Sequence, residues 1–272
     1  MDNGFIIAVL GGDRRQDLLA EVLAADGHRT HMIHEAGDLS YVEQAELIVL
    51  PLPACRDDGT IAGFSAPELF LHMRPGSVVA GGRIPAPLYG MSEMRGVTLH
   101  DYTTREDFAI ANALATAEGA IGIAITQTDI TIQGACCLII GNGRIGKLLA
   151  RKLALLGAQV TVSARRQEDI TWIQTDGHTA VKTADVASVA DRFDIIFNTV
   201  PFPVFGAPAL QKVRSNTLIV DLASKPGGVD FDTARMLGRR VEWALSLPAK
   251  CAPRSAAIYV RDSLYHIMEE SK

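Results

Sequence analysis

A glycine-rich segment in the middle of the chain has the residue types and spacing of a phosphate-binding turn. It reads Gly141-Asn-Gly-Arg-Ile-Gly146, follows the apolar run Cys136–Ile140 and precedes a helical pattern that ends at Gly157. Glycines at these positions permit a tight turn, a close backbone approach to a diphosphate and close packing of helix on strand. The amides at the start of the helix then attract the phosphate. We predict a dinucleotide site here, with a purely structural turn as the alternative.

The end of the next expected strand bears on which dinucleotide binds. NAD sites usually place a carboxylate about 20 residues after the glycines, where it binds the ribose 2′-hydroxyl. This sequence instead has Ser163, Ala164, Arg165 and Arg166 there. Two guanidiniums offer charge-assisted hydrogen bonds and a stacking plane for a 2′-phosphate, so the pattern favours NADP(H) over NAD(H). The alternative is a solvated pair of arginines.

Two further loops follow expected strands of the same half of the chain. They are residues 198–201 (Asn-Thr-Val-Pro) and 221–228 (Asp-Leu-Ala-Ser-Lys-Pro-Gly-Gly). Ligands bind outside the carboxyl ends of strands in open α/β sheets, so both loops should border the nicotinamide. Lys225 brings a cation to this position, unless it is simply a solvated turn residue. The predicted cofactor-binding residues are Gly141, Asn142, Gly143, Arg144, Ile145, Gly146, Ser163, Arg165, Arg166, Thr199, Val200, Pro201, Asp221, Ala223 and Ser224.

The N-terminal half repeats the strand-to-helix arrangement with different residues. Its segment Gly11-Gly-Asp-Arg-Arg-Gln16 lacks the third glycine, so we expect no second dinucleotide. Glycine amides together with Arg14 and Arg15 would suit a carboxylate at a helix start, although ordinary helix-start chemistry explains the same residues. Arg83, after a further expected strand, could bring another cation to the same edge.

Alternating strand and helix patterns predict how these loops are positioned. Strands that alternate with helices form parallel sheets with helices on both faces. We therefore predict an α/β fold of two doubly wound lobes, a flavodoxin-like N-terminal domain and a Rossmann NAD(P)-binding domain, joined by long helices. The expected ranges are 1–104 for the first domain, 105–127 for a linking helix and 128–253 for the second. A C-terminal helix over 254–270 should pack near the domain junction.

Composition narrows the class of protein. The chain has 272 residues, 48% of them hydrophobic, and a net charge of −5, which disfavours disorder and a nucleic-acid partner. Its four cysteines have neither a disulfide framework nor zinc-ligand spacing, and we predict no metal site. No apolar stretch is expected to reach the roughly 18–20 residues of a membrane span. We expect a cytoplasmic protein.

Several motifs together resemble the family of dipicolinate synthase A subunits, which take part in making pyridine-2,6-dicarboxylate for bacterial endospores. The resemblance spans nearly the whole chain, and its segments are 11–16 (GGDRRQ), 116–119 (TAEG), 128–134 (TDITIQG), 141–146 (GNGRIG), 221–230 (DLASKPGGVD) and 247–253 (LPAKCAP). It implies oxidation of a dihydro- or hydroxytetrahydro-dipicolinate, with hydride passing to NADP⁺. It also implies a flavoprotein-like partner, the dipicolinate synthase B subunit, and the mother cell of a sporulating bacterium.

The dicarboxylate substrate that this resemblance implies would need cations at both ends. The predicted substrate-binding residues are Asp13, Arg15, Arg83, Lys250 and Arg254. Glu118, on the small-residue linking helix, is the expected proton acceptor, and Lys225 is the second expected catalytic residue. We also expect a homo-oligomer.

Two alternatives remain open at this point. One is a D-2-hydroxyacid dehydrogenase-like reductase, which shares the two-lobed layout. None of the seven histidines follows the final strand, where such an enzyme would need its acid–base residue. The other is a non-catalytic, nucleotide-binding regulatory subunit, because no acid–base pair in the sequence is unambiguous.

Overall fold

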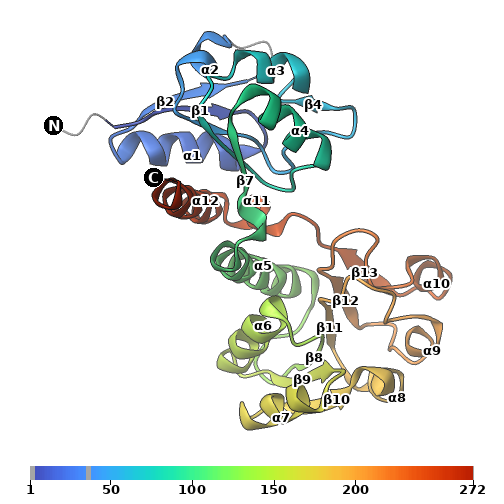
Figure 1. The fold of residues 1–272 in the computed structure, drawn as a ribbon. Helices are drawn as coiled ribbons and strands as arrows, with labels where there is room; N and C mark the ends of the chain where they lie inside the picture. Colours follow the sequence, from blue (N-terminus) through green and yellow to red (C-terminus); the bar gives the residue numbers. More distant parts are fainter. Residues whose placement is uncertain (1–3, 35–37, 272) are drawn as a thin grey trace. The chain divides into compact units, whose positions relative to one another are not determined.

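The computed structural model describes residues 4–34 and 38–271. It divides into two compact units (Figure 1). Unit 1 comprises Met1–Asn112 and Ala252–Lys272, and unit 2 comprises Ala113–Cys251. The division falls inside one long helix, between the boundaries at 104 and 127 expected from sequence. It assigns the C-terminal helix to unit 1.

Within its described residues, unit 1 contains a five-stranded parallel sheet with the order β2-β1-β3-β6-β7. The strands are β1 (Ile6–Leu10), β2 (Arg29–Ile33), β3 (Leu47–Val49), β6 (Val78–Gly81) and β7 (Thr98–Asp101). This is the flavodoxin-like order, as predicted. A short antiparallel hairpin, β4 (Thr60–Ile61) and β5 (Phe64–Ser65), was not predicted.

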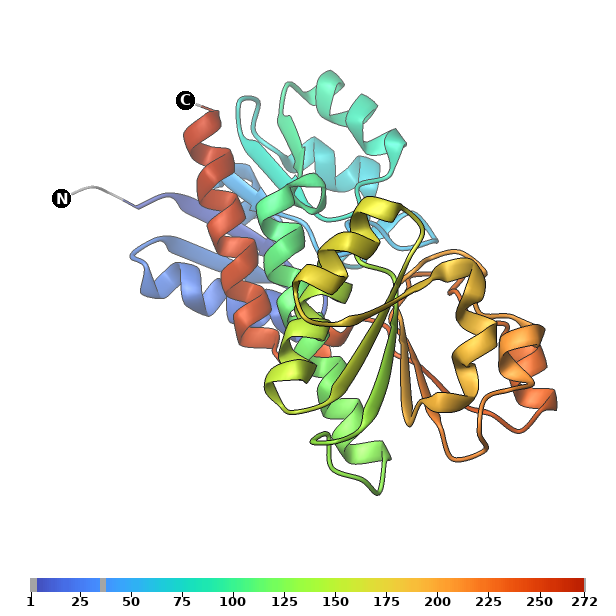
Figure 2. The ribbon, with the colours of Figure 1, turned by 90° about the horizontal axis from the view of Figure 1, so that it is seen from below.

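Helices cover both faces of the unit 1 sheet. They are α1 (Arg14–Ala25), α2 (Ser40–Gln44), α3 (Ala66–His72), α4 (Ala86–Arg95), the turn η1 (Tyr102–Thr104) and α12 (Pro253–Glu270). Successive strand residues alternate between faces, so Ile7 and Val9 join the core beneath α1 and α12, while Ala8 and Leu10 join the other core. In Figure 2 the red α12 crosses the blue strands of this sheet. Unit 1 therefore depends on the C-terminal helix to cover one of its faces.

Unit 2 contains a six-stranded parallel sheet, counted over the described residues, with the order β10-β9-β8-β11-β12-β13. The strands are β8 (Cys136–Ile140), β9 (Gln159–Ala164), β10 (Thr179–Lys182), β11 (Ile195–Asn198), β12 (Leu218–Asp221) and β13 (Arg240–Trp243). This is the Rossmann order, as predicted. The edge strand β10 was not predicted from the sequence.

The helices of unit 2 fall into two layers. The chain contributes to them α5 (Glu106–Gln127, from Ala113 onward), α6 (Arg144–Leu155), α7 (Gln167–Thr175), η2 (Thr183–Asp185), α8 (Val186–Val189), η3 (Ala190–Arg192), α9 (Ala207–Leu210), α10 (Phe231–Met236) and α11 (Leu247–Cys251). α5, α6 and α7 pack on one face of the sheet, and α8, α9 and α10 pack on the other. Both faces of each strand are thus buried, which explains the continuous apolar runs in the sequence.

The expectation that no apolar stretch reaches the length of a membrane span needs correction. α5 is, among the described helices, long and apolar enough to cross a membrane by length and composition. Half of its most apolar window is nevertheless buried inside the structure. Its alanines at 117, 120 and 124 have no exposed surface and pack in the core of unit 2. The helix therefore has the burial of a core helix.

Candidate functional site

The glycine turn between β8 and α6 is shaped by close backbone contacts. Gly141 has φ +102°, and a Cβ there would lie 2.6 Å from the hydroxyl oxygen of Thr199. A Cβ on Gly146 would lie 2.1 Å from the carbonyl oxygen of Gly141, so only glycine lets α6 start this close to the turn. Both positions have the packing role predicted for a dinucleotide fingerprint.

The start of α6 leaves room for a ligand. Gly143 is its N-cap residue and has no side chain that could cap the helix. A Cβ on Gly143 would meet nothing within 4 Å. The first amides of a helix lack intrahelical partners, and this start therefore offers donors and partial positive charge to an anion. The residues of the turn thus fit the diphosphate of a dinucleotide.

The two arginines after β9 differ in their surroundings. Arg166 donates from Nε to Asp169 Oδ2 at 2.8 Å, and its Nη1 lies 3.0 Å from Glu168 Oε1. The hydrogen bond from Arg166 holds the pKa of Asp169 below its usual value. Arg165 is exposed and has no polar partner among the residues described. The expectation of twin free guanidiniums is therefore corrected to one, because Arg166 already neutralises the first turn of α7.

Ser163 also differs from its predicted role. Its side chain is completely buried, and its hydroxyl lies 3.3 Å from the hydroxyl of Thr183. Ala164 is buried as well, so Arg165 is the first exposed side chain beyond β9. No carboxylate occupies the strand end that lies beside the glycine turn, where Gly141 donates its N–H to the carbonyl of Ser163 at 3.1 Å.

Asp221 connects the two loops that follow β11 and β12. Its fully buried carboxylate accepts hydrogen bonds from Asn198 Nδ2 at 2.8 Å and from the amides of Ala223 at 3.0 Å and Gly228 at 2.8 Å. A fourth comes from the amide of Val229 at 3.3 Å. Asp221 was predicted to bind the cofactor, but its oxygens are occupied by the chain itself. It fixes the loops instead.

Asn198 belongs to the predicted loop 198–201 but was not among the predicted cofactor-binding residues. Its amide group also donates to Val200 O at 3.0 Å, and its Oδ1 accepts from the Val200 amide at 3.2 Å. Asn198 and Asp221 are paired in the register of β11 and β12. Aligning the ends of the two predicted strands would have brought them together. With these contacts in place, Thr199 packs on Gly141 and donates its hydroxyl to Ile140 O at 2.9 Å.

The remaining predicted residues of these loops are mostly at the surface. Ser224 and Lys225 are exposed at the carboxyl end of β12, and Pro201 is exposed after β11. Ala223 is buried, and its carbonyl accepts a hydrogen bond from the Trp243 indole at 3.0 Å. Lys225 has no polar partner in the described part of the chain. Its ammonium is available to a ligand.

Glu118 does not face the glycine turn. Its carboxylate lies 2.8 Å from the ammonium of Lys152, in the last turns of α6. Lys152 follows the first helical residue, Arg144, by eight positions, or roughly 12 Å along the helix axis. Glu118 was expected to be a proton acceptor beside the nicotinamide. Its carboxylate instead joins α5 to α6, far along α6 from the glycine turn.

In unit 1, the start of α1 is closed by its own side chains. Asp13 is the N-cap residue and accepts from the Arg15 amide at 3.0 Å. The Arg15 guanidinium binds the same carboxylate, with Nη2 2.6 Å from Oδ2, and is only 8% exposed. Burial acts to raise the pKa of Asp13, but the hydrogen bond and charge of Arg15 lower it overall. Asp13 and Arg15 were predicted to bind substrate, and they satisfy each other instead.

The other predicted cations remain unpaired in the described structure. Arg83 is exposed after β6 with φ +55°. Lys250 is exposed on α11 in unit 2, and Arg254 is exposed in the first turn of α12 in unit 1. Each of the three can offer its charge to an anion.

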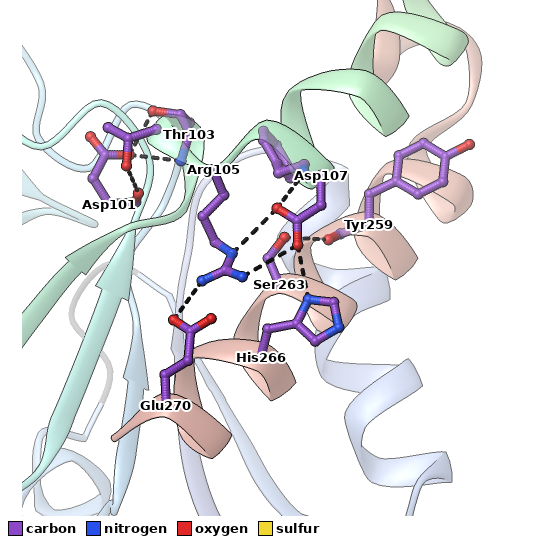
Figure 3. A network of polar contacts seen from close by, with 10 residues as sticks. Asp101, Thr103, Arg105, Asp107, Tyr259, Ser263, His266 and Glu270 are labelled. Carbon is purple, nitrogen blue, oxygen red and sulfur yellow. Dashed lines mark hydrogen bonds and ion pairs between the residues drawn. The ribbon is translucent and has the colours of Figure 1, made fainter. Parts of the chain in front are cut away.

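A polar network at the start of α5 was not predicted (Figure 3). Arg105 donates to Glu270 Oε2 at 2.8 Å and lies 3.3 Å from Asp107 Oδ1. Asp107 also lies 2.9 Å from His266 Nδ1. These contacts hold the end of α12 against the start of α5 within unit 1. Their members are separated by up to 165 positions in sequence, so no local pattern indicates them.

Cavities lie beside the β1–α1 turn of unit 1 and along α6 and α7 of unit 2. In unit 1, Gly11, Gly12, His34, Arg56 and Ala62 line about 260 Å³. In unit 2, about 600 Å³ runs along α6 and α7 and includes Asn142 in its lining. That larger cavity lies in the helical layer rather than at the carboxyl edge of the sheet, so we do not assign it to the dinucleotide.

Comparisons with known proteins agree with this geometry. Residues 6–103 match the family model for the N-terminal domain of the dipicolinate synthase A subunit, and residues 137–225 match the model "NADP oxidoreductase coenzyme F420-dependent". The dipicolinate synthase A subunit of Bacillus subtilis is 31% identical, over 99% of this chain and 98% of that protein.

Solved structures extend the comparison. The crystal structure of the dipicolinate synthase A subunit from Bacillus halodurans has a TM-score of 0.86 at 29% identity, covering 96% of each chain. The corresponding Bacillus subtilis structure has a TM-score of 0.87 at 28% identity, covering 100% of this chain and 98% of that one. A transhydrogenase from Sinorhizobium meliloti, with a TM-score of 0.72 at 17% identity over 92% of this chain and 80% of that one, shares the fold. The chain is an NAD(P)-dependent oxidoreductase, and it belongs to the family of dipicolinate synthase A subunits.

Proposed function

We propose that this chain oxidises a dihydro-dipicolinate, or a hydroxytetrahydro-dipicolinate that has lost water, to dipicolinate, with NADP⁺ as the hydride acceptor. One ring C–H bond breaks, its electron pair leaves as hydride, one proton is released and the pyridine ring becomes aromatic. The observation that carries the proposal is the uncapped, glycine-built start of α6 in a chain of this family.

The cofactor assignment rests on the residues around that turn. The α6 amides would hold the diphosphate, and Arg165 would bind a 2′-phosphate from beyond β9. Bound NADP⁺ supplies the hydride acceptor. The loops fixed by Asn198 and Asp221 would border the nicotinamide, because they leave the carboxyl ends of adjacent strands.

The substrate assignment needs cations for two carboxylates. Lys225 and Lys250 in unit 2, and Arg83 and Arg254 in unit 1, are exposed and without polar partners among the described residues. A charge-assisted hydrogen bond from any one of these groups would bind a carboxylate of the substrate. Lys225 remains the proposed catalytic residue, since it follows the strand that carries the fixed nicotinamide-side loop.

A dehydrogenation assay tests the proposal. The purified chain, with and without the flavoprotein-like B subunit, is given freshly formed hydroxytetrahydro-dipicolinate and NADP⁺, and NADPH is followed by absorbance. We expect NADPH and dipicolinate in equal amounts. If the chain binds NADPH but never turns over without its partner, a regulatory role is the better description. Reduction of glyoxylate or pyruvate instead would favour a hydroxyacid dehydrogenase.

We further propose a homo-oligomer in the cytoplasm of a sporulating mother cell. The resemblance of the whole chain to the Bacillus subtilis protein supports this setting. Light scattering on the purified chain gives the oligomeric state, and a fluorescent fusion followed through sporulation gives the compartment.

A further inference from the structure

Arg83 has a left-handed backbone conformation and an exposed side chain. Its backbone has φ +55°, in the left-handed region that side chains other than glycine seldom adopt. Its side chain is nevertheless exposed and has no polar partner among the described residues. Strained residues persist only where their surroundings hold them, and they cluster at ligand-binding sites.

The group that holds Arg83 is the carboxylate of Asp101, at the end of the neighbouring strand β7. Asp101 Oδ1 accepts from the Arg83 amide at 3.2 Å, and Oδ2 accepts from the Ile84 amide at 2.9 Å. Oδ1 also accepts from the amide of Thr103 at 2.8 Å and from its hydroxyl (Figure 3). One carboxylate thus fixes two consecutive amides of the strained segment.

Gly82, the residue before Arg83, is tightly packed against its neighbours. A Cβ on Gly82 would lie 2.5 Å from Leu52 Cδ1 and 3.0 Å from side-chain atoms of Tyr102 and Thr103. Gly82 is buried, and its carbonyl accepts from the Ala54 amide at 2.7 Å. The backbone at Arg83 therefore has little conformational freedom, and this fixes the direction of its Cα–Cβ bond.

We propose that Asp101 is a positioning residue that holds Arg83 at the carboxyl end of β6, so that its guanidinium binds a carboxylate of the dicarboxylate substrate. The assignment rests on the proposed function. Arg15, at the start of α1, is not available for this role because Asp13 and the Leu52 carbonyl occupy its guanidinium. Ligands of open α/β sheets bind outside the carboxyl ends of the strands, where Arg83 lies.

Calorimetric titration with dipicolinate, on the full chain saturated with NADP⁺, tests the assignment. We expect Arg83→Ala to weaken dipicolinate binding at least about tenfold. Asp101→Asn keeps one acceptor oxygen, so it can bind the amide of Arg83 or that of Ile84 but not both. We therefore expect dipicolinate affinity to fall roughly three- to tenfold, while NADP⁺ affinity stays the same. Arg74→Ala is the matched control. Arg74 is an exposed arginine that precedes β6, so it lies at the amino end of the strand, whereas Arg83 lies at the carboxyl end.

The double variant separates positioning from general stability. If Asp101 acts through Arg83, adding Asp101→Asn to Arg83→Ala causes no further loss of affinity. Additive losses, or an unchanged affinity in Arg83→Ala, would overturn the assignment. If the parent chain binds NADP⁺ but no dipicolinate, the proposed substrate class fails and this assignment fails with it.

Discussion

Two helices of this protein start directly after the first strand of their sheets, yet they start in opposite ways. The N-cap residue of α6 is Gly143, which has no side chain to cap the helix. The N-cap residue of α1 is Asp13, whose carboxylate caps the helix and binds Arg15. The topology is the same, but one start is open to an anion and the other is closed by an anion of its own. The side chain at the cap is thus the difference between the proposed diphosphate site and a structural turn.

The most disruptive change would give α6 the cap of α1. Gly143 has φ −82° and open space around its Cβ, so Gly143→Asp should fold normally. Its carboxylate would then take the place of the diphosphate and repel it, and we expect NADPH affinity to fall at least about a hundredfold. Fluorescence titration with NADPH measures this loss.

Gly206→Asp is the matched control for that substitution. Gly206 is also a helix N-cap in unit 2, with φ −100° and nothing within 4 Å of a Cβ. We expect its NADPH affinity to match that of the parent. Equal losses in the two variants would mean that charge anywhere in unit 2 weakens binding, and the comparison of helix starts would lose its meaning.

Arg165→Ser should sharpen the cofactor assignment. We expect NADPH to bind about tenfold more weakly, while NADH binds as before, because only NADPH has the 2′-phosphate. Arg166→Ser is the internal control and should change neither affinity, since Arg166 is paired with Glu168 and Asp169. Parent affinities that are equal for NADPH and NADH would refute the preference for NADP(H).

Asp13→Asn should weaken the closed start of α1. Asparagine still caps a helix, but it removes the charge opposite Arg15, and we expect about 1 kcal/mol less stability at pH 7. The folded-state pKa of Asp13 is lowered. Its contribution is therefore present above the unfolded pKa of about 3.9 and is lost as the pH falls through the lower folded value.

Urea unfolding of the parent and of Asp13→Asn at several pH values measures that contribution. The gap between the two should close below about pH 4. Asp17→Asn, on the same helix but outside the Asp13–Arg15 pair, is the control for removing a carboxylate from this helix. A gap that persists at low pH would mean that the charge of Asp13 is not what stabilises this helix start.

The smallest effect is expected at Glu118. Its ion pair with Lys152 joins two helices, and the carboxylate is more than half exposed. Glu118→Gln should cost no more than about 0.5 kcal/mol and leave turnover with NADP⁺ nearly unchanged. A large fall in turnover without a change in NADPH affinity would restore its role as proton acceptor.

Sequence patterns predicted those parts of the fold that depend on local order. Buried parallel strands give continuous apolar runs, so the run Cys136–Ile140 has the observed bounds of β8, and the strand expected before the loop 198–201 is β11. β10 was not predicted because Thr179–Lys182 is a half-exposed edge strand without a continuous apolar run. The two-residue strands of the β4–β5 hairpin are too short to form a period.

The site was less predictable because side-chain pairing decides it. The sequence identifies Arg165 and Arg166 as equals, and only the structure shows that Asp169 takes one of them. Asn198 and Asp221 are 23 positions apart and meet through strand register. Spacing finds residue types that can do chemistry, but it does not tell which of them the fold has already used.

The most direct measurement is a crystal structure of the chain with NADP⁺. The account predicts diphosphate oxygens within about 2.7–3.2 Å of the backbone amides that begin α6, with the 2′-phosphate at Arg165. A dinucleotide bound at the start of α1, or none bound to the folded chain, would contradict it.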